Sequence, residues 1–178
     1  RQARAWLDAD LPIGRIAVNM SSNDLHRSNF VSQLQQALRD NDIPGECLEL
    51  EITEDSLISK ETNIFDRLQE IRGLGVSLAV DDFGTGYSSL AYLRDLHVDK
   101  IKIDQSFVRN DDPRDHAIIR AITQMGSEFG FLVLAEGIET QQQRSTLGEL
   151  GCQLGQGFLF ARPAPPEQIA RAYAQAVL

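Results

Sequence analysis

The stretch VSLAVDDFGTG, residues 76–86, decides how this sequence folds. Its first five residues are small or apolar and predict a buried strand, and two adjacent carboxylates, Asp81 and Asp82, stand where that strand ends. The glycines that follow permit either a simple tight turn or a loop that moves over a site opening. A helical pattern comes next, so the stretch predicts one strand-to-helix unit with ionised residues at the junction.

Similar units recur along the chain on both sides of this stretch. Short runs rich in β-forming residues alternate with segments in which apolar residues recur every three to four positions. Alternation of this kind is typical of a parallel sheet covered by helices. The predicted strands span residues 15–20, 47–52, 76–80, 98–103, 131–135 and 152–160.

Helix ends are also marked in the sequence. Gly73, Gly130 and Gly151 each follow a helical pattern, where a left-handed C-cap is expected. Thr140 precedes Gln143 by three residues, which predicts a capping box at the start of a helix.

Polar residues at the strand ends favour one of two parallel architectures. A doubly wound sheet binds ligands at a single switch point, whereas a (β/α)8 barrel collects residues from the carboxyl ends of many strands. Every predicted strand here carries or precedes such a residue, so we expect a modified TIM-type (β/α)8 barrel. The residues are Asn19, Glu51, Asp81, Asp82, Lys102, Asp104, Glu136 and Gln156.

The number of strands does not fill such a barrel. Six strands are predicted, a barrel has eight, and such barrels run to ~250 residues whereas this chain has 178. Residues 1–7 also read as a helix that precedes the first predicted strand. We therefore expect an N-terminally truncated barrel of about six β/α units.

Composition excludes several classes of protein. The net charge of −9 argues against a general binder of DNA, RNA or anionic membranes. No apolar run approaches the roughly 20 residues of a transmembrane helix. Cys47 and Cys152 form no CxxC pair, so we expect reduced core thiols in a cytoplasmic protein rather than a disulfide or zinc scaffold.

The strand-end residues form an all-oxygen ligand set, which suits Mg²⁺ or Mn²⁺. Adjacent carboxylates such as Asp81 and Asp82 can reach two cations, as two-metal phosphate-ester hydrolysis requires. Lys102 could hold the attacking water or a phosphoryl oxygen. The alternative is purely structural: the aspartates cap the next helix, and Lys102 pairs with Asp104.

Six short motifs, in order, resemble those of the EAL-domain family of bacterial cyclic di-GMP phosphodiesterases. The resemblance covers essentially the whole chain. The motifs are VNMS at 18–21, EITE at 51–54, DDFGTG at 81–86, KID at 102–104, EGIE at 136–139 and GQGF at 155–158.

The resemblance implies a modified barrel that hydrolyses cyclic di-GMP to linear pGpG with Mg²⁺ or Mn²⁺, and a homodimer as its assembly. It implies that Lys102 positions the attacking water, that Glu136 is a metal-site carboxylate or general base, and that Glu54 anchors the loop at 82–90. The implied metal ligands are Asn19, Glu51, Asp81 and Asp82, and the implied supporting or substrate residues are Asp104, Glu139, Gln156 and Phe158.

One family motif is missing: the tripeptide Glu-Ala-Leu occurs nowhere in the chain. In the family it lies upstream of residue 18, so residues 1–178 are expected to lack the N-terminal strands that carry it and to have little or no activity alone. Three hypotheses follow, in order of preference: a phosphodiesterase, a non-catalytic cyclic di-GMP receptor, and a dimerisation or assembly module.

Overall fold

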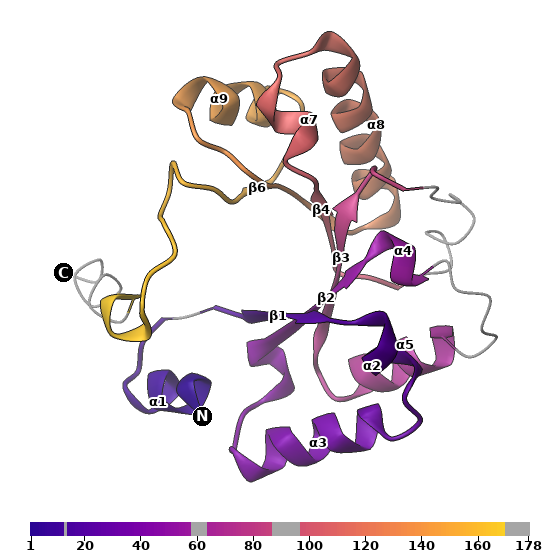
Figure 1. The fold of residues 1–178 in the computed structure, drawn as a ribbon, viewed down its shortest axis with the longest axis vertical. Helices are drawn as coiled ribbons and strands as arrows, with labels where there is room; N and C mark the ends of the chain where they lie inside the picture. Colours follow the sequence, from indigo (N-terminus) through magenta and orange to yellow (C-terminus); the bar gives the residue numbers. More distant parts are fainter. Residues whose placement is uncertain (13, 58–63, 87–96, 170–178) are drawn as a thin grey trace.

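The computed structural model describes residues 1–12, 14–57, 64–86 and 97–169 (Figure 1). Its centre is one six-stranded sheet with the order β1-β2-β3-β4-β5-β6, in which every neighbouring pair is parallel. The strands are β1 (Ile16–Met20), β2 (Leu48–Thr53), β3 (Ser77–Phe83), β4 (Lys100–Ile103), β5 (Leu132–Ala135) and β6 (Leu154–Gly155).

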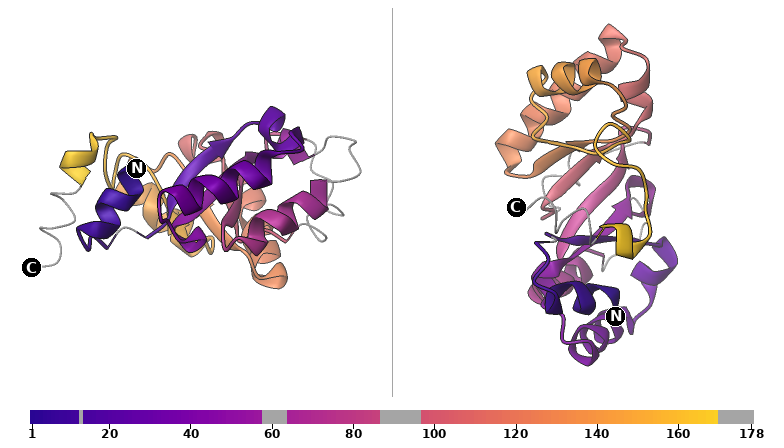
Figure 2. Two further views of the ribbon diagram at one scale, coloured as in Figure 1. Left: turned by 90° about the horizontal axis from the view of Figure 1, so that it is seen from below. Right: turned by 90° about the vertical axis from the view of Figure 1, so that its left-hand side faces the viewer.

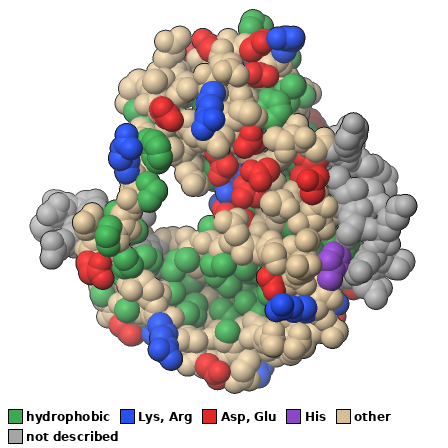
Figure 3. Space-filling model, in the orientation of Figure 1, with side chains coloured by type: hydrophobic (Ala, Val, Ile, Leu, Met, Phe, Trp, Pro, Cys, Tyr) green, Lys and Arg blue, Asp and Glu red, His purple; other side chains and the backbone are tan. Residues whose placement is uncertain are grey.

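The strand order distinguishes the two predicted architectures. A doubly wound sheet reverses its order at a switch point, whereas here each strand lies beside the next one in the chain. Helices cover the outer side of the resulting arc, and residues 161–169 run along its open side towards α1 (Gln2–Asp8) (Figures 1 and 2). The space-filling view shows an opening on the inner side of the arc (Figure 3). The six-stranded part of a TIM-like barrel is therefore confirmed.

Local sequence signals explain most helix ends. At the start of α8 (Pro113–Phe129), the Asp112 side chain accepts a hydrogen bond from the Arg114 backbone N–H, and Gly130 closes the same helix in the left-handed conformation. The predicted capping box of Thr140 and Gln143 opens α9. The helices are α1 (Gln2–Asp8), α2 (Ser22–His26), α3 (Phe30–Asp40), α4 (Glu54–Leu57), α5 (Ile64–Gly73), α7 (Ser106–Arg109), α8 (Pro113–Phe129) and α9 (Gln141–Glu149), with a 3₁₀ turn at Gly45–Cys47.

Two local predictions were wrong. Gly73 is the last residue of α5, and Gly75 takes the left-handed conformation instead, with φ 85°. The sixth strand pairs only over Leu154–Gly155 instead of residues 152–160. Beyond it, Gly157 packs so closely on the backbone of Ile138 that a side chain would not fit, and the chain turns off the ladder there.

The hydrophobic core lies between the sheet and its helices. Residues that alternate along the central strands, such as Leu50, Leu78 and Ile101, point outward and are buried by the helices. None of the described helices is long and apolar enough to span a membrane.

Both cysteines are free thiols, and Cys152 packs against this core. Burial raises the pKa of the Cys152 thiol to about 11, so it stays protonated at neutral pH. The expectation that this thiol packs against the core is thereby confirmed for Cys152.

Candidate functional site

Charged side chains gather on the inner face of the sheet, near the carboxyl ends of the central strands. Residues in register on parallel strands point to the same face, and Glu51 is in register with Asn19 on β1 and with Ala79 on β3. Glu51 therefore faces the opening rather than the helices. In the space-filling view, acidic side chains cluster at the edge of this opening (Figure 3).

Lys102 on β4 is the centre of this cluster. Its Nζ lies 2.8 Å from Glu51 Oε1, 2.9 Å from Asp81 Oδ1 and 2.8 Å from Glu136 Oε1. The lysine side chain is only 5% exposed, and a buried charge is tolerated when it is paired in this way. The alternative pairing with Asp104 is wrong, because Asp104 Oδ1 accepts a hydrogen bond from the Ser106 backbone N–H instead.

Burial and charge act in opposite directions on this lysine. Burial alone lowers the pKa of Lys102, but its contacts with Glu136, Glu51 and Asp81 outweigh burial and raise the pKa above its usual value. Lys102 therefore remains a cation at neutral pH. Three carboxylates around one cation still leave a local excess of negative charge.

A β-bulge brings Asp81 and Asp82 to the same side of β3. In a regular strand, successive side chains point to opposite faces. Here Val80 pairs with Ile101 and Phe83 with Ile103, so β3 contains one residue more than β4 between these pairs. The backbone accommodates the extra residue at Asp82, which adopts the left-handed conformation with φ 54°. Backbone strain of this kind concentrates at functional sites.

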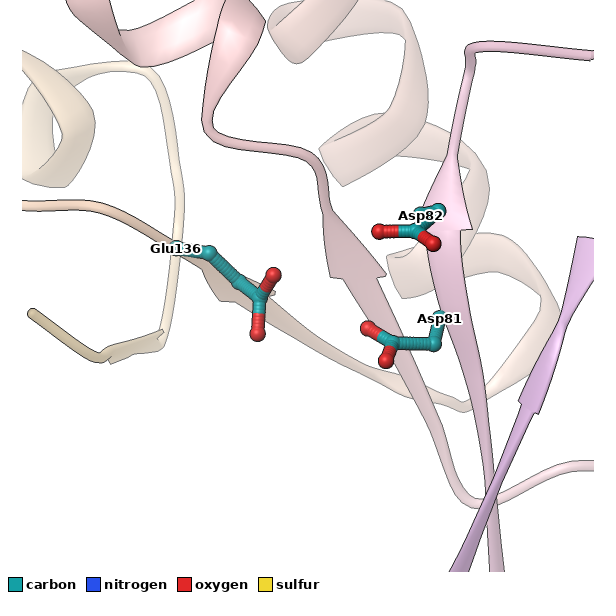
Figure 4. Close-up of side chains that lie close together, drawn as sticks. All are labelled: Asp81, Asp82 and Glu136. Atoms are coloured by element: carbon teal, nitrogen blue, oxygen red, sulfur yellow. The ribbon is translucent and has the colours of Figure 1, made fainter. Parts of the chain in front are cut away.

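The bulge creates a group of three carboxylates that could hold a metal ion. Asp81, Asp82 and Glu136 point toward a common space (Figure 4), and each offers an oxygen within 4.8 Å of the others. Asp81 Oδ1 is buried, and its charged neighbour is Lys102 Nζ at 2.9 Å, a cation that it shares with Glu51 and Glu136. An all-oxygen donor set of three converging carboxylates, with Lys102 as the only cation in contact with them among the described residues, fits a hard divalent cation.

The electrostatics of these carboxylates agree with that fit. Burial is the main cause that raises the pKa of Glu136, and Lys102 opposes it. Burial also raises the pKa of Asp82, and the neighbouring carboxylates of Asp81 and Asp104 add to the effect. Burial thus disfavours the charged form of both carboxylates, and a divalent cation between them would favour it.

Glu54 connects this site to the loop that follows β3. It opens α4, directly after β2, and is only 4% exposed. Its Oε2 accepts a hydrogen bond of 2.9 Å from the backbone N–H of Gly84. The loop at 82–90 that it is expected to anchor is described only as far as Gly86.

The remaining predicted residues differ in their surroundings. Asn19 is exposed on β1, beside Glu51, and Glu139 is exposed just before α9. Gln156 is exposed, and its backbone bonds with Ala135 and Ile138. Phe158 is 51% exposed, with the Arg162 guanidinium 4.7 Å from its ring centroid, so it is not a core residue.

A buried ion pair between Glu49 and Lys100 did not figure among the predicted site residues. Lys100 Nζ lies 2.7 and 2.8 Å from the two carboxylate oxygens of Glu49, one layer below Lys102. The signal was present in the sequence: LELEI at 48–52 and KIKI at 100–103 alternate charged and apolar residues with opposite charge.

The family profile of the EAL domain matches residues 1–163. The chain belongs to the EAL domain family. The cyclic di-GMP phosphodiesterase NbdA of Pseudomonas aeruginosa is 44% identical to this EAL chain over 164 residues, which are 89% of the chain and 21% of that protein.

Solved EAL structures share the fold. The PaMucR phosphodiesterase, in complex with c-di-GMP, has a TM-score of 0.89 at 38% identity, over 94% of this chain and 69% of that chain. Klebsiella pneumoniae BlrP1, with manganese and c-di-GMP, has a TM-score of 0.82 at 32% identity, over 91% of this chain and 42% of that chain. The EAL chain spans less than a third of the length of the curated relatives it matches.

Proposed function

We propose that this EAL chain carries the catalytic residues of a divalent-metal-dependent phosphodiesterase that hydrolyses cyclic di-GMP to linear pGpG. The observation that carries the proposal is the buried Lys102, which contacts three carboxylates beside the group formed by Asp81, Asp82 and Glu136. The names of the relatives NbdA and PaMucR support the same substrate.

The proposed metal site draws on four strands of the sheet. Divalent cations bound there would supply activation of a water molecule and stabilisation of the leaving oxygen of a phosphate ester. Oxygen ligands of the kind that Mg²⁺ and Mn²⁺ prefer are available on the inner face. The proposed ligands are Asn19, Glu51, Asp81 and Asp82, and Glu136, which follows β5, completes the site as its general base.

Lys102 and Glu136 have separate roles in the proposed reaction. Lys102 stays protonated, so its N–H groups donate hydrogen bonds to the attacking water or to a phosphoryl oxygen and hold it in place. Glu136 accepts the proton of that water, because burial raises its pKa and makes it a stronger base than an exposed carboxylate. The water oxygen bonds to phosphorus and one phosphodiester bond breaks. The leaving oxygen receives a proton from solvent, to which Glu136 returns the proton that it accepted.

The other implied residues complete the proposal. Glu54 holds the start of the loop after β3 through the backbone N–H of Gly84, and the proposed assembly of the domain is a homodimer. Asp104, Glu139 and Gln156 support the site, and the exposed ring of Phe158 is available to contact a guanine base.

The test is turnover in an EAL domain in which a segment with the Glu-Ala-Leu tripeptide precedes residue 1. With Mn²⁺, we expect conversion of cyclic di-GMP to pGpG, measured by chromatography, and a loss of at least about 10²-fold in Asp81→Asn. The matched control is Asp111→Asn, an exposed aspartate that pairs with His116.

Three measurements bear on the choice between a phosphodiesterase and a receptor. Full activity in Asp81→Asn would overturn the proposal. Tight nucleotide binding without turnover would favour the receptor hypothesis instead. Residues 1–178 alone are expected to show little or no turnover, because the carboxylate of the tripeptide is not among them.

A further inference from the structure

A second buried ion pair spans the same strands as the Lys102 cluster. Lys100 on β4 contacts both carboxylate oxygens of Glu49 on β2, at 2.7 and 2.8 Å. The side chains are only 15% and 3% exposed, respectively. The proposed chemistry does not use either residue, although a buried ion pair carries a considerable desolvation cost.

Glu49 and Lys100 form the lower of two charged layers. On β2, Glu49 and Glu51 point to the same face, roughly 6.6 Å apart along the strand, and Lys100 and Lys102 are related in the same way on β4. A lysine side chain is long enough to reach a glutamate in either layer. The structure shows one arrangement, in which Lys100 pairs with Glu49 and Lys102 with Glu51.

Small side chains on β3 allow these contacts across an intervening strand. Ser77 is in register with Glu49, and Ala79 is in register with both Glu51 and Lys100. Their short side chains leave room for the longer side chains of β2 and β4 to meet above them. Ala79 is fully buried but does not belong to the hydrophobic core on the outer face.

We infer that Lys100 is a positioning residue for the divalent-cation site, because it neutralises Glu49 and so keeps Lys102 paired with the carboxylates of the upper layer. Without Lys100, Glu49 becomes a buried carboxylate with no cation of its own, which is strongly unfavourable. Lys102 is the other lysine of β4 on the same face, and it then shifts toward Glu49. Asp81 and Glu136 lose their counter-charge, and the group that would hold the metal spreads apart.

The test compares Mn²⁺ affinity among four variants of residues 1–178 by titration calorimetry. Lys100→Met is expected to bind Mn²⁺ about 10- to 100-fold more weakly, the usual effect of losing a residue that supports metal ligands. Lys100→Arg keeps the charge and restores most of the affinity. Glu49→Gln combined with Lys100→Met removes both charges of the lower layer, so it is also expected to restore most of the affinity.

Val133→Ala is the matched control for a purely structural effect. Val133 is fully buried on β5, and its truncation destabilises the core without changing any charge. It should lower the melting temperature and leave Mn²⁺ affinity unchanged. If Lys100→Met behaves in the same way, the inference is wrong.

The double variant keeps the inference testable if Lys100→Met does not fold. It contains no unpaired charge in the lower layer, so we expect it to fold and to bind Mn²⁺ nearly as well as the wild type. Weak binding by the double variant would overturn the inference. The inference rests on the proposed function only for its consequence in catalysis: if the affinities change as expected but no pGpG forms in the extended domain, the function alone is wrong.

Discussion

The two faces of β2, β3 and β4 differ completely in chemistry, although they belong to the same strands. The outer face presents Ile52, Leu78 and Ile101 to the helices, all at most 1% exposed. The inner face presents glutamates and lysines that pair across β3. Apolar packing is non-directional and holds the fold together, whereas paired charges are directional and place reactive groups. Stability and function should therefore respond to different substitutions on one strand.

The largest effect is expected at the centre of the inner face. Lys102→Met removes the cation shared by Glu51, Asp81 and Glu136, so turnover in the extended domain should fall by about 10²- to 10⁴-fold. Without metal the protein should also melt earlier, because the three carboxylates then repel one another, and Mn²⁺ should reverse much of that loss.

The control for this change is Arg114→Met, which removes an ion pair with an 88% exposed side chain. Such a pair contributes little, so activity and melting temperature should stay close to those of the wild type. Equal losses in the two variants would show that Lys102 has no special role.

The neighbouring outward residue should give the opposite result. Ile101→Ala leaves a cavity at a fully buried position and should lower the free energy of unfolding by about 2–5 kcal/mol, measured by urea denaturation. Mn²⁺ affinity of the folded protein should not change. A loss of metal affinity as large as that of Lys102→Met would remove the distinction between the two faces.

A smaller effect is expected in the loop that follows β3. Glu54→Gln replaces a charged acceptor of the Gly84 N–H by a neutral one. Hydrogen bonds to charged groups contribute about 1.5–3 kcal/mol and neutral ones about 0.5–1.5 kcal/mol, so we expect a loss of roughly 1 kcal/mol in urea denaturation. Glu46→Gln, at an exposed position, should lose nothing; equal stability of both variants would argue against an anchoring role for Glu54.

The smallest effect is expected far from the site, at the start of α8. Hydrogen bonds with the Arg114 side chain and backbone lower the pKa of Asp112 to about 2. Because the folded-state pKa lies below the unfolded value, this contribution to stability is present at neutral pH and is lost as pH falls from about 4 to about 2. Asp112→Asn should melt slightly earlier at pH 7 and no earlier at pH 2. A difference that persists at pH 2 would contradict this account.

The alternation of residue types predicted much of this molecule. Runs such as LELEI at 48–52 show which side chains share a face, and polar residues at successive strand ends indicate a barrel rather than a doubly wound sheet. These signals depend on local periodicity, which a single sequence displays directly.

Tertiary geometry determined the parts that could not be predicted. Periodicity places Asp81 and Asp82 on opposite faces, and only the bulge between Val80 and Phe83 turns them to one side. In the same way, the partners of Lys102 depend on which strands lie beside β4, and sequence neighbours such as Asp104 gave the wrong partner in the structural alternative. The sixth strand ends at Gly155, and the close approach of Gly157 to the backbone of Ile138 just beyond it is a contact that local periodicity does not reveal.

The most direct test of the central claim is Mn²⁺ binding to residues 1–178, followed by electron paramagnetic resonance as free Mn²⁺ disappears. If the inner face holds a divalent-cation site, the wild type should bind Mn²⁺, and Asp81→Asn should bind at least about tenfold more weakly. Ile101→Ala should bind as the wild type does once the folded fraction is taken into account. Equal Mn²⁺ affinity in the wild type and Asp81→Asn would contradict the account.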